Sequence, residues 1–191
     1  PSNNLIDIFK NCSVRKLTKN HCETTNLSSL RTLLCNQTQL EELNLRNFHA
    51  QSNLFYGTDF LKIKFRLKVL KVDNLPISER LNENFKKFLS LHKETLEVLD
   101  LDVIDEETSM ILNNFHQLSA LSFETISLNF TQTAQIIELK VKHRSGLFLP
   151  SSFSLDDLPH QFPSVRKFTI INSMRISFIK NFHHLNCASK S

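Results

Sequence analysis

The sequence predicts an α/β fold made of about seven irregular repeats, in which short parallel strands alternate with helices. The stretch LEVLDLDVI, residues 96–104, carries apolar residues at positions 1, 4, 6 and 9. The same spacing recurs in LEELNLRNF from Leu40, LKVLKVDNL from Leu67 and LSALSFETI from Leu118, and looser copies begin at Val14, Ile136 and Val165. Recurrence at intervals of mostly 20–29 residues is typical of proteins that stack one supersecondary unit many times.

This spacing matches the leucine-rich repeat, L-x-x-L-x-L-x-x-N/C-x-L. Positions 4 and 6 alternate as in a strand, so both side chains point into one core, while position 1 fills that core from the preceding turn. A single unit cannot bury its own apolar face, so stacking is required. We therefore expect one domain, 1–191, shaped as a curved solenoid (a horseshoe) with the parallel sheet on its concave face. The expected core residues are Leu43, Leu45, Leu70, Val72, Leu99, Leu101, Leu121 and Phe123.

Helices are predicted between the strands. Residues 27–34 form a short one. Residues 77–91 place Ile77, Leu81, Phe85, Phe88 and Leu89 on one face after Ser78 as N-cap. Residues 105–115 open with acids, which favour the positive end of a helix, and direct Met110, Leu112 and Phe115 to the core. The pattern weakens after Thr125, and 145–163 reads as loop because Gly146 and three prolines interrupt it.

Composition narrows the class of protein. The 191 residues are 40% hydrophobic and 22% charged, as in globular proteins, and no apolar run approaches a membrane span. Two glycines exclude the glycine-rich loops that bind nucleotides. The four cysteines are too few and too unevenly spaced for a disulfide scaffold, and we expect them to be thiols. The chain begins at Pro1, so we expect a fragment or a processed product.

Two stretches carry a resemblance to a known family. NCSVRKLTKNHC (11–22) has Cys12 before a strand and Cys22 at the N/C position, and HKETLEVLDLDVI (92–104) runs from a helix end into a strand. Both resemble the leucine-rich-repeat portion of F-box/LRR proteins, the substrate receptors of cullin-type ubiquitin ligases. The resemblance implies an intracellular protein, cytoplasmic or nuclear, whose ligase adaptor binds a region absent from this chain. The alternative is a secreted effector that mimics such a receptor inside a host cell.

Candidate sites for chemistry are weak. An acidic cluster suggests a calcium-binding site, but its spacing and the missing glycine do not fit an EF-hand loop. The cluster comprises Asp100, Asp102, Asp105, Glu106 and Glu107. His183, His184 and Cys187 offer metal ligands without an evident fourth. His21 and Cys22 are adjacent, so on a strand they point to opposite sides and form no catalytic dyad. We expect no catalysis, no metal and no cofactor.

The outward positions of the strands are the sharper signal for function. They predict a concave protein-binding face comprising Arg46, Lys71, Asp73, Asp100, Asp102, Glu124, Lys140 and Lys142. The acids form a band, with Lys71 beside them to moderate their repulsion. We expect a monomeric, non-catalytic protein-recognition module that binds no membrane. The alternative is a nucleic-acid-binding solenoid that uses the basic C-terminal repeats. Against it, the outward positions lack aromatic residues for stacking on bases, and the acids in the middle would repel phosphate.

Overall fold

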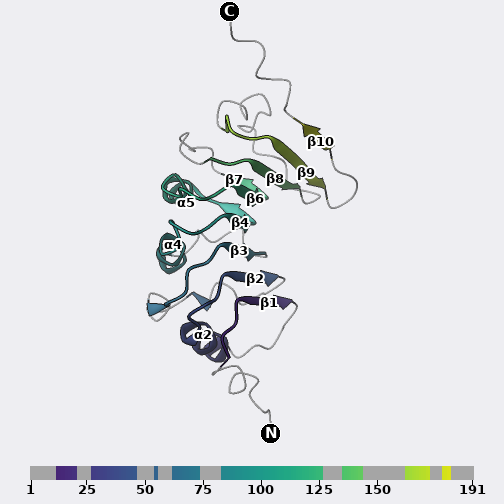
Figure 1. Ribbon diagram of the computed structural model, residues 1–191. Coiled ribbons are helices and arrows are strands. Elements are labelled where there is room, and N and C mark those ends of the chain that lie inside the picture. The colour runs from purple at the N-terminus through teal and green to yellow at the C-terminus, as the bar shows by residue number, and fades with distance from the viewer. Residues whose placement is uncertain are drawn as a thin grey trace, which may run out of the picture.

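The computed structural model describes residues 12–20, 27–46, 54–55, 62–73, 83–126, 135–143, 162–172 and 178–181. Its main sheet holds, in spatial order, β1 (Lys16–Asn20), β2 (Glu42–Arg46), β3 (Val69–Val72), β4 (Val98–Leu101), β6 (Ala120–Phe123), β8 (Glu138–His143), β9 (Lys167–Asn172) and β10 (Phe178–Asn181). Strands β1 to β9 in that order are parallel, and β10 is antiparallel to β9. A second, two-stranded parallel sheet pairs β5 (Val103–Ile104) with β7 (Thr125–Ile126). The described helices, α2 (Leu27–Asn36), α4 (Glu83–Ser90) and α5 (Glu106–Leu112), lie on one side of the main sheet (Figure 1).

Each of the seven parallel strands begins two residues after a start predicted from the apolar spacing. The start at 14 leads to β1 at Lys16, and the start at 165 leads to β9 at Lys167. The leading residues Leu40, Leu67 and Leu96 are fully buried at the strand entries. The sequence pattern thus predicted the parallel sheet and its register, because a slip of one residue would turn every leucine outward.

The core lies between the main sheet and the helices. All eight residues predicted for it are at most 1% exposed. Phe85 and Phe88 of α4 fill the space behind the sheet and pack on Phe55, with ring centroids 4.8 and 5.1 Å from that ring. Each such side chain contributes roughly 1.5–3 kcal/mol through burial, which compensates for the cost of ordering short strands.

The helices agree with the sequence in part. Helix α5 begins where predicted, with Asp105 as N-cap accepting a hydrogen bond from the Thr108 N–H at 2.8 Å. Met110 was expected in the core but is 60% exposed, because it lies two residues from buried Leu112 and so on the opposite side of the helix. The described part of α4 starts at Glu83, so Ser78 and the rest of 77–82 lie outside the described residues, as does most of 145–163. No helix in the described ranges is long and apolar enough to cross a membrane.

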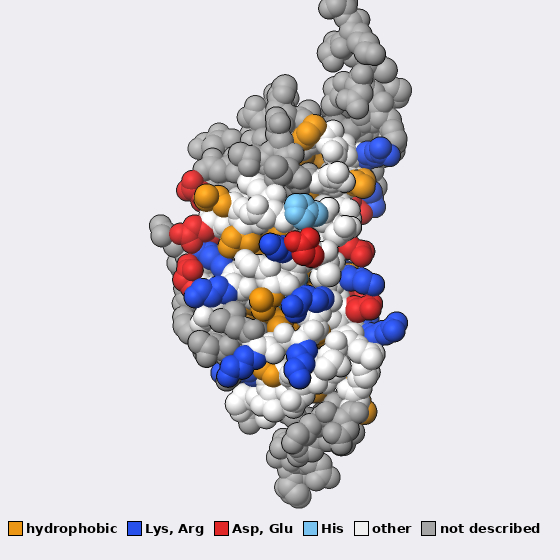
Figure 2. Space-filling view, turned by 60° about the vertical axis from the view of Figure 1, so that its left-hand side comes forward, with side chains coloured by type: hydrophobic (Ala, Val, Ile, Leu, Met, Phe, Trp, Pro, Cys, Tyr) orange, Lys and Arg blue, Asp and Glu red, His pale blue; other side chains and the backbone are white. Residues whose placement is uncertain are grey.

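An extended segment, 62–68, leads into β3 with strictly alternating burial. Ile63, Phe65 and Leu67 point inward, while the four cations between and beside them are exposed. Buried His92 anchors this segment: its Nδ1 accepts a hydrogen bond from the Leu67 N–H at 3.2 Å, and its ring stacks on Phe65. Figure 2, with the helix side turned forward, shows acidic and basic side chains interspersed over much of this surface.

Candidate protein-binding surface

The side of the main sheet opposite the described helices, called the open face below, presents side chains in rows. Because the parallel strands are in register, outward residues of neighbouring strands stand next to each other, about 4.8 Å apart. The first row runs Lys16, Glu42, Val69, Val98, Ala120, Glu138 and Lys167. The second runs Thr18, Asn44, Lys71, Asp100, Ser122, Lys140 and Thr169. The predicted site residues Lys71, Asp100 and Lys140 therefore share one row.

The ends of the first row are ion pairs and its middle is apolar. Lys16 lies 2.9 Å from Glu42 at one end, and Lys167 lies 3.0 Å from Glu138 at the other. Glu138 is also 3.0 Å from Lys140. Hydrogen bonds from Lys167 and then Lys140 lower the pKa of Glu138. The row thus offers a small apolar strip bounded by charge, an arrangement common to protein-binding surfaces.

A lysine-centred cluster lies along the ends of the strands. The Lys142 Nζ is 2.5 Å from Asp100, 3.2 Å from Asp73 and 3.3 Å from Asp102. Asp73 is in turn 3.8 Å from Arg46. Burial lowers the pKa of Lys142, but the three carboxylates outweigh it and raise that pKa above its ordinary value. Five of the eight predicted site residues therefore belong to one ion-pair network.

This geometry corrects the expected role of Lys71. Lys142, rather than Lys71, holds the acids together, because its long side chain reaches across β6 to β4. Asp102 is only 2% exposed and Glu124 only 6%. Both were predicted to project from the concave face, and this is wrong because they are buried, whereas Asp73 and Asp100 remain partly accessible. Lys142 and Arg46 thus form ion pairs with three of the four predicted acids, Asp73, Asp100 and Asp102.

The acids between residues 100 and 107 divide between two sides of the molecule. Asp100 and Asp102 face Lys142, whereas Asp105 and Glu107 of α5 pair with Lys86 of α4. The Lys86 side chain is 5% exposed. Burial lowers its pKa, but the Glu107 hydrogen bond and the surrounding acids raise it overall. Sequence reasoning missed Lys86, because the acids that open α5 are already favoured by the helix N-terminus and so gave no signal for a nearby cation.

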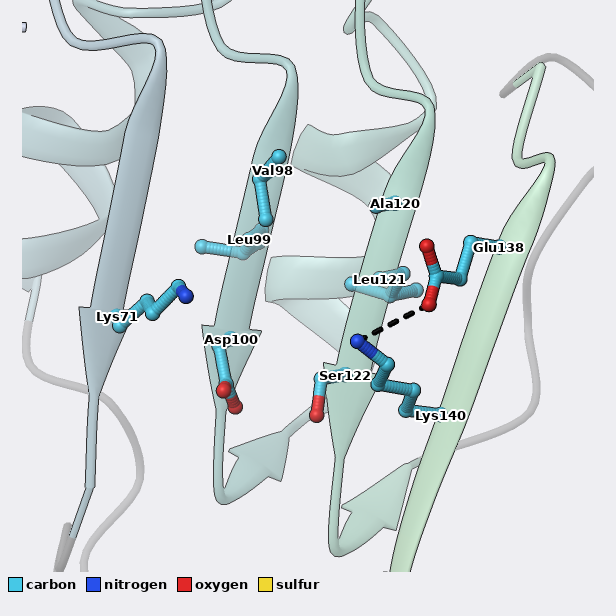
Figure 3. Close-up of a pocket in the computed structure, with 9 residues that line it drawn as sticks. All are labelled: Lys71, Val98, Leu99, Asp100, Ala120, Leu121, Ser122, Glu138 and Lys140. Atoms are coloured by element: carbon cyan, nitrogen blue, oxygen red, sulfur yellow. Dashed lines mark ion pairs between the residues drawn. The ribbon is translucent and has the colours of Figure 1, made fainter. Parts of the chain in front are cut away.

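A shallow pocket lies in the centre of the open face (Figure 3). Strand β6 contributes only Ala120 and Ser122 to the outward rows, while the strands on either side carry longer side chains. Val98 and Asp100 of β4 line one wall. The small side chains of β6 are thus the physical reason for the hollow.

Other candidates contribute less. Among the described residues, no group of three or more His, Cys, Asp or Glu side chains could hold a metal ion. His21, Cys22, His183, His184 and Cys187 lie outside the described ranges. Cys12 is exposed, and Cys35 packs partly buried against the core.

The cations proposed for nucleic-acid binding are mostly engaged. Lys140 and Lys167 share Glu138, and Lys142 is surrounded by three acids. Lys and Arg side chains bind nucleic acid by replacing the counterions of its phosphates, and these three lysines already have carboxylate partners.

Comparison with known proteins adds no further assignment. No protein-family model matches the chain, and neither a curated protein nor a solved structure matches it. Function is therefore inferred from the repeat pattern and from the geometry of the open face.

Proposed function

We propose that the chain is a leucine-rich-repeat solenoid that acts as a non-catalytic protein-recognition module, binding a partner protein on the open face. The single observation that supports this most is the register of the seven parallel strands. It places two complete rows of outward side chains on a face that carries none of the described helices. Stacked repeats of this kind use such extended surfaces for binding.

The composition of the open face supports a protein partner. An apolar strip of Val69, Val98 and Ala120 lies in the centre, and charged residues in ion pairs surround it. Protein interfaces have the same anatomy, an apolar centre within a polar rim. Because the sequence resembles F-box/LRR receptors, the specific role that we propose is recognition of substrates for a cullin-type ubiquitin ligase.

A matched pair of substitutions tests the location of binding. Val98→Arg places a long cation in the centre of the open face, whereas Met110→Arg makes the same chemical change on the exposed side of α5. The tagged wild type and both variants are each used to capture proteins from a cell lysate, and the captured proteins are quantified by mass spectrometry. We expect partners of the wild type to be lost with Val98→Arg and kept with Met110→Arg. The opposite pattern, or equal capture by all three, would remove the open face from consideration.

A further inference from the structure

The central pocket of the open face has two ammonium groups above it. Figure 3 shows Lys71 extending from β3 toward β4, and Lys140 extending from β8 over β6. The Lys71 ammonium makes no hydrogen bond or ion pair with the part of the chain that the structure describes. Lys140 pairs with Glu138, but this carboxylate is shared with Lys167 at the same 3.0 Å distance.

The second acid that lines the pocket is already in an ion pair. Asp100 lines the pocket, but its carboxylate lies 2.5 Å from the Nζ of Lys142, which is not a lining residue. In Figure 3 this carboxylate points along the strand, away from Val98. The Lys71 ammonium therefore has no carboxylate partner in the part of the chain that the structure describes.

Ser122 supplies a polar group that lacks a partner. The residue is 6% exposed, and its Oγ has no hydrogen-bond partner among the described residues. A buried hydroxyl without a partner is unfavourable, and such groups in native structures are commonly satisfied by a ligand or water. This hydroxyl can donate a hydrogen bond to an anion held between the two lysines.

We propose that this pocket receives an acidic side chain, Asp or Glu, of the protein that binds the open face. The carboxylate lies between Lys71 and Lys140 and accepts a hydrogen bond from Ser122, while the methylene carbons contact Val98 and Ala120. Charge-assisted hydrogen bonds of this kind are among the stronger polar contacts in interfaces. The inference rests on the proposed function, since it names the chemistry that the open face selects.

A peptide library supplies the probe. Random twelve-residue peptides displayed on phage are selected on the immobilised full chain, on Lys71→Glu and on Lys87→Glu. Lys87 is exposed on α4, on the helix side, so the second variant makes the same charge change away from the pocket. We expect the wild type and Lys87→Glu to enrich an acidic residue at one fixed position. Lys71→Glu should lose this preference or replace it with Lys or Arg.

The best peptide and its Glu→Gln or Asp→Asn form are then compared by fluorescence anisotropy. We expect Kd to rise roughly ten- to a hundredfold on loss of the charge, and Ser122→Ala to reduce this difference. Circular dichroism melting checks that each variant is folded.

The outcomes separate the two proposals. Peptides that bind without an acidic residue, or with a basic one, and that are lost with Val98→Arg would overturn the pocket inference and leave the open face as the binding surface. Peptides that bind equally to Val98→Arg, or the absence of any enriched peptide, would count against both.

Discussion

His92 should make the protein lose stability as the pH falls below about 6.5. Its imidazole is fully buried, and burial, followed by the charge of Arg66, lowers its pKa to about 3. In the unfolded chain a histidine titrates near 6.5. Between these two values the unfolded state binds a proton that the folded state does not, so acid favours unfolding. The contribution of His92 is complete above pH 6.5 and is lost as the pH falls toward 3.

The magnitude follows from the separation of the two pKa values. At about 1.4 kcal/mol per pH unit, the free energy of unfolding should fall by about 2 kcal/mol between pH 8 and pH 5, and by about 3 kcal/mol at pH 4. This is a large part of the stability of a typical domain. The contacts of the buried ring explain why the fold keeps a neutral histidine here. The ring accepts a hydrogen bond from the Leu67 N–H, stacks on Phe65 and meets Phe88 edge-on with centroids 4.8 Å apart.

Urea unfolding followed by circular dichroism at pH 8, 6.5, 5 and 4 measures the effect. His92→Asn retains an acceptor near the Nδ1 position but cannot titrate, so it should be less stable at pH 8 yet lose about 2 kcal/mol less on going to pH 5. His116→Asn, at an exposed histidine, is the control and should follow the wild type. Parallel losses in the wild type and His92→Asn, or an NMR titration of His92 near 6.5, would refute the reasoning.

Three further outcomes are expected. Leu99→Asp puts a carboxylate into a fully buried position and should abolish cooperative unfolding, whereas Val98→Asp next to it points outward and should retain it; equal melting curves would contradict the register. Lys142→Met leaves three acids without their cation and should cost about 2–4 kcal/mol by urea unfolding, against less than about 1 kcal/mol for exposed Lys93→Met. The pKa of Lys142 is raised in the folded state, so its contribution is complete below the unfolded value of about 10.5 and should shrink as the pH rises from there through the raised folded pKa. Thiol titration in denaturant without reductant should find all four cysteines reactive, and a smaller number would indicate a disulfide.

The strands could be predicted because their signal is local and repeated. Leu99 and Leu101 must both be buried, and only one register of a strand buries both. The error at Met110 came from counting an apolar residue without its helical angle to Leu112. Short-range patterns therefore located the sheet and the core well.

The charged site was harder to predict because its contacts join distant residues. Lys142 is 69 positions from Asp73 in sequence, and they meet only because β4 and β6 form between β3 and β8 in the main sheet. The burial of Lys86 depends in the same way on where α5 lies against α4. Their outward positions in the strands predicted that Asp100 and Lys142 lie on the same face, but not that the two form an ion pair.

The strict alternation of inward and outward residues along the parallel strands separates two kinds of sequence change. Substitutions at inward positions alter stability, whereas those at outward positions such as Val69, Ser122 or Thr169 alter the chemistry that a partner meets. An outward residue outside the ion-pair clusters, such as Val69 or Thr169, can change with little effect on the residues of the next strand. A binding surface built this way can acquire a new specificity one strand at a time, through intermediates that all remain folded.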